Sequence, residues 1–265
     1  MVLAMAGATT VSAIDVLVVT SLETPGYDLI LSAAQSACNQ ISIKKVNLAT
    51  NTHVNLPQLV RNTRAKVVIG FGDKAFKLAN ATVRVPVIGA MVTDQKNSAV
   101  SFVAPPSMYL AAIKKLGWKH VGLIHSAHMK TYALHVVKVA RQNGITIIRR
   151  VADSPPETIE RFSEINGLID SLWILPDTKA ITAGSAEILI RGAQEKDIPV
   201  IAFSRNYLKN GSALVIEPDR EAIGKAIGER LCAMGEDPFS LENKNLYRVF
   251  QNEVVINRLR MSSPS

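Results

Sequence analysis

Short apolar runs alternate along the chain with stretches in which apolar residues recur at helical spacing. The first run, Ile14 to Val19, is almost continuously hydrophobic, which is typical of a strand buried on both faces of a sheet. The next stretch opens at Pro25-Gly26 and places Ile30, Ala34 and Cys38 on one helical face. The alternation then continues, so the sequence predicts repeated β-α-β units.

The same patterns predict the remaining elements. Strands are expected at 14–19, 43–48, 67–71, 85–91, 99–103, 120–124, 145–151, 172–175, 199–203 and 212–217, with a last extended run at 247–256. Helices are expected from residue 25 onward and at 56–64, 73–80, 107–116, 131–142, 156–165, 180–194 and 219–234. Such units connect through right-handed crossovers, which give parallel sheets with helices on both faces.

The predicted strands fall into two series, and two sheets fit them better than one long sheet does. Segments near 99–106 and 217–218 contain prolines and are expected to connect two lobes. Lobe one is predicted at 14–102 and 217–243. Lobe two is predicted at 103–216 and 244–258.

Polar residues gather where the predicted strands end. In open parallel sheets, ligands bind beyond the carboxyl ends of the strands. The candidate ligand-binding residues at these ends are Ser21, Glu23, Thr24, Gly72, Asp73, Thr93, Asp94, His125, Ser126, Thr131, Asp177, Thr178, Ser204 and Arg205. For any one loop, helix capping or turn formation is the more common explanation of such residues. Their recurrence after six strands predicts a ligand cleft between the lobes.

The charge of the chain points to no particular partner. It carries a net charge of +8 over 265 residues, but its basic residues are scattered and no aromatic residues interleave with them. Nucleic-acid binding normally needs a clustered basic face or stacking aromatics. We therefore expect a solvated basic surface and no nucleic-acid partner.

The first thirteen residues are apolar or small and end in Val11-Ser12-Ala13. This resembles the end of a secretory signal peptide, and it predicts a signal-peptide remnant at 1–13 and a periplasmic protein. A disordered tail is the alternative. The two cysteines, Cys38 and Cys232, would then form a disulfide in an exported protein or remain two buried thiols.

Signatures of catalysis are missing from the sequence. Gly70-Phe71-Gly72 does not complete a dinucleotide fingerprint, and neither a phosphate-binding loop nor a nucleophile elbow occurs. His125 and His128 lack a third metal ligand, and Asp94 and Asp177 lack an accompanying nucleophile. The sequence predicts a protein that is not an enzyme and that carries neither cofactor nor metal.

Several segments match a known family in the right order. They are Val85-Pro86-Val87-Ile88-Gly89-Ala90-Met91-Val92-Thr93-Asp94, Lys119-His120-Val121-Gly122-Leu123-Ile124-His125, Leu172-Trp173-Ile174-Leu175-Pro176-Asp177-Thr178, Ile198-Pro199-Val200-Ile201-Ala202-Phe203-Ser204-Arg205 and residues 224–235. In these segments the chain resembles the tryptophan/tyrosine-type substrate-binding proteins of ABC transporters. The resemblance runs over about residues 14–240.

This resemblance implies a type I periplasmic-binding-protein-like fold: two α/β lobes, each a parallel sheet flanked by helices, with a ligand cleft between them. It implies a monomer that captures a small organic ligand, such as an amino acid, and delivers it to a membrane permease. A sensing subunit that signals through a membrane receptor is the alternative. The resemblance also implies that Asp177 holds a ligand ammonium, and that Ser126, Thr178 and Ser204 contact the ligand.

Three loops depart from the family pattern. The segment from His125 to Thr131 lacks the asparagines usual there, and Arg205 replaces an acidic residue. The first loop, Ser21-Leu22-Glu23-Thr24-Pro25, is also atypical. Arg205 and His125 would suit a ligand rich in carboxylates. The residues therefore leave the identity of the ligand open.

Overall fold

The computed structural model describes residues 13–93, 99–233 and 246–262, and the chain divides into two compact units. Unit 1 comprises residues 1–102 and 219–246, and unit 2 comprises residues 103–218 and 247–265. Glu217 and Pro218 thus belong to unit 2, although lobe one was predicted to resume at residue 217. The reason is that the strand containing them continues to Pro218, which pairs with Tyr247. The predicted signal remnant and Asp94 lie outside the described residues, except for Ala13.

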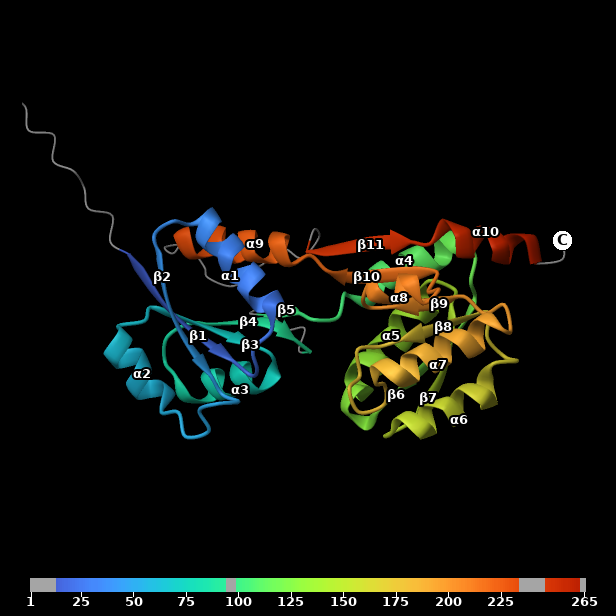
Figure 1. Cartoon of the computed structure of the whole chain (residues 1–265), viewed down its shortest axis with the longest axis horizontal. Coiled ribbons are helices and arrows are strands. Elements are labelled where there is room, and N and C mark those ends of the chain that lie inside the picture. The colour runs from blue at the N-terminus through green and yellow to red at the C-terminus, as the bar shows by residue number, and fades with distance from the viewer. Residues whose placement is uncertain (1–12, 94–98, 234–245, 263–265) are drawn as a thin grey trace, which may run out of the picture. The chain divides into compact units, whose positions relative to one another are not determined.

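Unit 1 is built on a parallel five-stranded sheet of order β2-β1-β3-β4-β5. Its strands are β1 (Ile14–Thr20), β2 (Ile41–Asn47), β3 (Val67–Phe71), β4 (Val87–Val92) and β5 (Ala99–Ser101). Its helices are α1 (Pro25–Ala37), α2 (Leu56–Thr63), α3 (Asp73–Thr82) and α9 (Arg220–Cys232). Helices α1 and α9 cover one face of the sheet, and α2 and α3 cover the other (Figure 1).

Helix α9 packs against α1 because glycines allow a very close approach. A Cβ atom at Gly224 would lie 2.3 Å from the Ile30 carbonyl oxygen, and one at Gly228 would lie 2.3 Å from that of Ala34. One turn further on, Cys232 forms a disulfide with Cys38. Of the two alternatives for the cysteines, the structure thus has the disulfide. It ties the returning segment of the chain to the first helix of unit 1.

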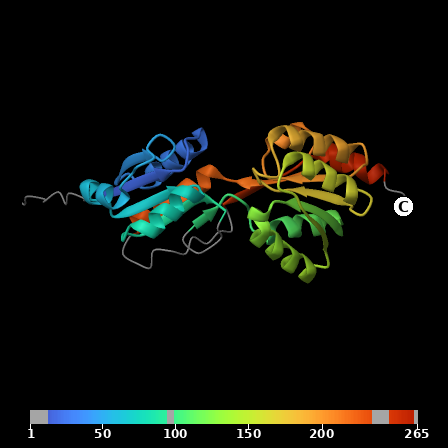
Figure 2. The same cartoon turned by 90° about the horizontal axis from the view of Figure 1, so that it is seen from below.

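Unit 2 contains a six-stranded sheet of order β11-β10-β9-β8-β6-β7, in which β11 runs antiparallel to β10. Its strands are β6 (His120–His125), β7 (Thr146–Val151), β8 (Ser171–Ile174), β9 (Val200–Ala202), β10 (Leu214–Pro218) and β11 (Tyr247–Gln251). Its helices are α4 (Pro106–Leu116), η1 (Ala127–Met129), α5 (Lys130–Gln142), α6 (Pro155–Ile165), α7 (Ala183–Gln194), α8 (Asn206–Lys209) and α10 (Glu253–Ser262). Helices α4 and α5 lie on one face and α6 and α7 on the other (Figure 2).

An aromatic group anchors the core of unit 2. Trp173 is 1% exposed, and its ring centroid lies 4.3 Å from that of Tyr109. The Tyr109 hydroxyl donates to the Ile216 carbonyl at 3.0 Å, and the Tyr132 hydroxyl donates to that of Ala104 at 3.0 Å. These bonds satisfy two phenols that would otherwise be costly to bury.

Two sequence predictions of local structure were wrong, and one helix was missed. The run 247–256 is not extended throughout: β11 ends at Gln251, and α10 begins at Glu253 with Asn252 accepting a bond from the Val255 N–H. The helix expected from residue 180 begins at Ala183, because Thr182 and Ser185 form a capping box. The short helix α8 was not predicted. Within the described ranges, no helix has the length and apolar character needed to span a membrane.

Candidate functional site

The predicted residues of unit 1 meet at the ends of three adjacent strands. Ser21 follows β1, Gly72 and Asp73 follow β3, and Thr93 follows β4. The Ser21 hydroxyl oxygen accepts a bond from the Ala75 N–H at 2.9 Å. Thr93 donates its backbone N–H to Asp73 Oδ1 at 2.8 Å and its hydroxyl to Asp73 Oδ2 at 2.7 Å.

Tyr27, from the first turn of α1, lies beside these residues, and sequence reasoning missed it. Its ring centroid is 4.7 Å from that of Phe71. A Cβ atom at Gly72, whose φ is +79°, would lie 2.9 Å from Ser21 Oγ and 3.4 Å from the Tyr27 hydroxyl. Burial, and then the charge of Asp73, raises the Tyr27 pKa above its usual 10.0. We call Ser21, Tyr27, Gly72, Asp73 and Thr93 the unit 1 cluster.

Two further predicted residues of unit 1 stand apart from these contacts. Glu23 is exposed in the loop before α1. Thr24 occupies the N-cap position of α1, but its side chain makes no capping hydrogen bond. The available signal for Tyr27 was an aromatic residue in the first turn of the helix that follows a strand-end loop. Sequence reasoning selected Thr24 in that loop instead.

In unit 2, Asp177 is buried and accepts hydrogen bonds from its own loop and from Ser126. It is 3% exposed, and Ser126 donates both its N–H, at 2.6 Å, and its hydroxyl, at 2.9 Å, to the carboxylate. The N–H groups of Lys179 and Ala180 donate to Asp177 Oδ1 at 3.2 and 3.3 Å. The structure therefore brings the candidate residues Ser126 and Asp177 into contact, and four N–H and O–H donors already bind the carboxylate.

His125 is completely buried next to this pair. Its Nδ1 lies 2.7 Å from the Ser126 carbonyl oxygen, and its Nε2 lies 3.0 Å from Arg149 Nη1. A neutral ring that donates from Nδ1 and accepts at Nε2 satisfies both contacts. Burial is the main cause that lowers the His125 pKa below 6.5, and the nearby Arg149 charge adds to it. Arg149, on β7, was not among the predicted residues.

Arg205 is engaged by a buried acid that the sequence analysis did not select. Glu217 has a side chain that is 8% exposed, and its Oε1 lies 2.7 Å from Arg205 Nε. Glu217 Oε2 also accepts the Arg205 backbone N–H at 2.8 Å. The guanidinium lies 5.4 Å from the centre of the Phe250 ring. An acid that ends an otherwise apolar strand was the available signal for Glu217.

The remaining predicted residues of unit 2 are accessible. Thr131 and Thr178 are exposed, and Ser204 is partly buried with its hydroxyl accepting from the Asn206 N–H at 3.4 Å. Thr178 and Ser204 follow neighbouring strands, β8 and β9, whereas Thr131 lies in the first turn of α5. The described part of the chain contains no group of three or more His, Cys, Asp or Glu side chains that could hold a metal ion.

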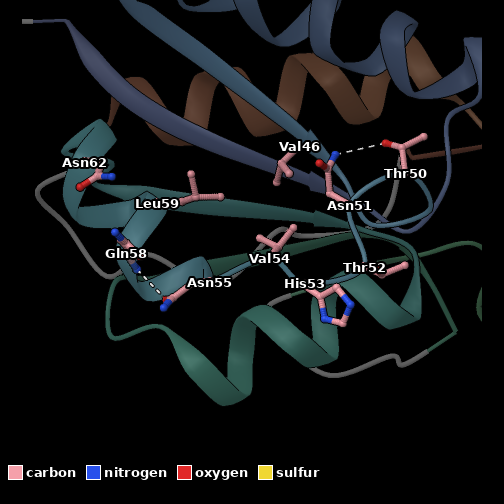
Figure 3. Close-up of a pocket in the computed structure, with 10 residues that line it drawn as sticks. All are labelled: Val46, Thr50, Asn51, Thr52, His53, Val54, Asn55, Gln58, Leu59 and Asn62. Carbon is pink, nitrogen blue, oxygen red and sulfur yellow. Dashed lines mark hydrogen bonds between the residues drawn. The ribbon is translucent and has the colours of Figure 1, made fainter.

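A cavity of about 690 Å³ lies elsewhere in unit 1, between the loop after β2 and α2 (Figure 3). Its lining is Val46, Thr50, Asn51, Thr52, His53, Val54, Asn55, Gln58, Leu59 and Asn62. Two hydrogen bonds connect residues of this lining (Figure 3). The Asn51 side-chain amide donates to the Thr50 hydroxyl, and the Gln58 N–H donates to Asn55 Oδ1. None of the predicted ligand-binding residues lines it, so this cavity is distinct from the unit 1 cluster.

Two α/β units with parallel sheets and flanking helices define a type I periplasmic-binding-protein-like fold, as predicted. No family model matches the sequence. Among curated proteins, the chain is 23% identical over 197 residues to the Tyrosine-binding protein of Clostridioides difficile. That match covers 67% of this chain and 56% of that protein.

Two solved structures share the fold over almost the whole chain. One is the ligand-free, open form of a substrate-binding protein with adhesive properties from Clostridium difficile, with a TM-score of 0.75, 19% identity, and coverage of 96% of this chain and 97% of that one. The other comes from Streptococcus pneumonia in complex with L-Trp, with a TM-score of 0.64, 21% identity, and coverage of 94% and 95%. The predicted resemblance to substrate-binding proteins of the tryptophan/tyrosine type is thus confirmed as a similarity.

Proposed function

We propose that this chain is a substrate-binding protein that captures an amino acid or a related small metabolite by closure of its two units. The observation that carries the proposal is the gathering of polar side chains at strand ends in both units. These residues are Ser21, Asp73 and Thr93 in unit 1, and Thr178 and Ser204 in unit 2. One similar protein is named for tyrosine and another was solved in complex with L-Trp, which supports the amino-acid class.

The three connections between the units support a hinge. The chain passes from one unit to the other at 102–103, 218–219 and 246–247. Hinge closure around a ligand needs only a few residues at such connections to change their backbone angles. In this proposal the protein binds its ligand and performs no chemistry on it.

The first test measures ligand binding by the intact protein. A thermal-shift and native mass-spectrometry screen would cover amino acids, nucleosides and organic acids. A true ligand at 100 times its Kd is expected to add about 2.7 kcal/mol to the free energy of unfolding. Small-angle scattering should show a smaller radius of gyration with the ligand. Absence of any stabilising compound, or recovery of a chemically altered compound, would contradict the proposal.

A pair of unit 2 variants tests the location of the site. Thr178→Ala removes an exposed hydroxyl at a strand end, and Ser163→Ala removes one from the surface of α6. We expect the first to weaken binding of the identified ligand about fivefold, the effect of one hydrogen bond. The second should leave the Kd unchanged. Equal effects of both variants would argue against a site at the strand ends.

We propose further that the protein works outside the cytoplasm as a monomer and delivers its ligand to a membrane permease. The Cys38–Cys232 disulfide supports this location, because such bonds persist in oxidising compartments. Non-reducing mass spectrometry of protein from its host cell should find the disulfide, and deletion of the gene should reduce uptake of the ligand. Unchanged uptake with a lost cellular response would favour a sensor as the partner.

A further inference from the structure

The unit 1 cluster contains a carboxylate whose charge is not neutralised by any described residue. Asp73 is half-buried, and its only hydrogen-bond donors among the described residues are the N–H and hydroxyl of Thr93. Lys74, the next residue along α3, is exposed and makes no ion pair with it. Each carboxylate oxygen retains a free lone pair, since a carboxylate offers about four acceptor positions. Thr93 therefore orients the group without using up its capacity.

Tyr27 contributes an aromatic ring to the same cluster. Tyr27 packs on Phe71, and the turn at Gly72 keeps its hydroxyl close to the residue that precedes Asp73. The Tyr27 hydroxyl makes no hydrogen bond to any described residue. A tyrosine is neutral near pH 7, and burial raises the Tyr27 pKa further. Asp73 is the only carboxylic acid of the cluster. A carboxylate and an aromatic residue in one cluster can together accept an organic cation.

The charged groups at the strand ends of unit 2 do not compete for this role. The Asp177 carboxylate has four donors, and Glu217 forms an ion pair with Arg205. Both acids are buried, whereas Asp73 is partly open to solvent. The resemblance implied that Asp177 would hold a ligand ammonium, but its contacts favour a structural role instead.

We infer that the unit 1 cluster is the ammonium subsite of the protein, with Asp73 accepting hydrogen bonds from a primary ammonium of the ligand and Tyr27 packing beside it. The inference rests on the proposed function and narrows it to ligands that carry a primary amine. Thr93 acts as a positioning residue through its two bonds to Asp73. Ligands that lack the amine would leave the Asp73 charge desolvated and unpaired when the site closes.

Calorimetry on the wild-type protein tests this directly. The probes are L-tyrosine and L-tryptophan, their decarboxylated amines, and the deaminated acids hydroxyphenylpropionate and indolepropionate. We expect each deaminated acid to bind about tenfold to a hundredfold more weakly than its parent, the usual effect of losing a hydrogen bond to a charged group. Deaminated acids that bind as tightly as their parents would overturn the inference and leave the proposed function standing. The inference would also be overturned, and the proposed function would stand, if none of the six probes bound and the wider screen found a ligand without an amine.

Two carboxylate variants localise the effect. Asp73→Asn keeps the shape of the side chain and removes its charge, and it should abolish the preference for the amine. Asp28→Asn is the matched control, because Asp28 is an exposed acid of α1 that pairs with Lys45. It should keep the preference. If a folded Asp73→Asn protein keeps the preference for the amine, the inference is overturned. If that variant does not fold, the probe series on the wild type tests the inference instead. A screen in which no compound at all stabilises the wild type would instead contradict the proposed function.

Discussion

The acids at the strand ends differ sharply between the two units. In unit 2, Asp177 and Glu217 are buried and bound by backbone N–H groups, a hydroxyl or a guanidinium. In unit 1, Thr93 is the only described residue that donates hydrogen bonds to Asp73, and Asp73 remains partly accessible. Similar positions relative to a sheet therefore carry different chemistry. The acids of unit 2 maintain loop structure, while the acid of unit 1 is available to a ligand.

The same contrast explains the roles of the neighbouring bases. The sequence suggested Arg205 as a contact for an anionic ligand, but Arg205 forms an ion pair with the buried Glu217. Arg149, which the sequence analysis did not select, contacts the buried His125. A base engaged in this way contributes less to recognition of a carboxylate. The departures from the family pattern at His125 and Arg205 thus have an explanation within unit 2 itself.

The units differ also in how they are held together, and this difference gives the largest expected effect. Only unit 1 has a disulfide, since the chain has two cysteines and both lie there. The variant with Cys38→Ser and Cys232→Ser should lose about 4 kcal/mol of unfolding free energy, because the bond closes a long loop. Urea unfolding measures the loss. Hydrogen exchange should accelerate in α1 and α9 and stay slow in β6 and β8. Equal acceleration in both units would show that the disulfide does not stabilise unit 1 selectively.

The second prediction concerns the two aspartates. Asp177→Ala should cost about 3 kcal/mol, because it leaves the buried Ser126 N–H and its neighbours without an acceptor. Asp73→Asn should cost about 1 kcal/mol, since it disturbs only the bonds from Thr93. Chemical denaturation of both variants checks the contrast. Equal costs would mean that the two acids have the same structural role. Because of this cost, loss of binding in Asp177→Ala alone would not identify it as a ligand contact.

The third and smallest effect is a pH dependence confined to unit 2. The pKa of His125 is lowered in the folded state, so the unfolded chain binds the proton more readily as the pH falls below 6.5. The contribution of neutral His125 to stability is fully present above pH 6.5 and is lost as the pH falls towards its folded-state pKa. Unfolding of the wild type at pH 7.5 and 5.5 should show this decrease.

His125→Gln should reduce that pH dependence, while His128→Gln, at an exposed position, should preserve it. Protonation would also place a positive ring against Arg149. Among the other groups near the ring, the Ser126 carbonyl acts in the opposite direction through its hydrogen bond and raises the His125 pKa, and Asp177 and Asp153 raise it too. An unchanged pH dependence in His125→Gln would show that another group dominates it.

The order of strands and helices was predictable from the sequence because it depends on local periodicity. The buried run of β1, the stripe of α1 and the turn at Gly117 are all determined by residues close together in the chain. For the same reason, the sequence placed polar residues such as Asp73, Ser126 and Asp177 at strand ends. It failed at 252–253, where an extended pattern continues smoothly into the helix α10.

The tertiary structure alone decided which of those side chains are engaged by other residues of the protein. Asp177 accepts hydrogen bonds from Ser126, which lies 51 residues away in the chain. The Cys38–Cys232 disulfide joins residues 194 positions apart, and Glu217 forms an ion pair with Arg205, in the loop after the neighbouring strand. The availability of a charged side chain depends on such distant partners and on burial, which periodicity does not encode. The accessible carboxylate of Asp73 and the ring of Tyr27 could be recognised only after the chain had brought β1, β3 and α1 together.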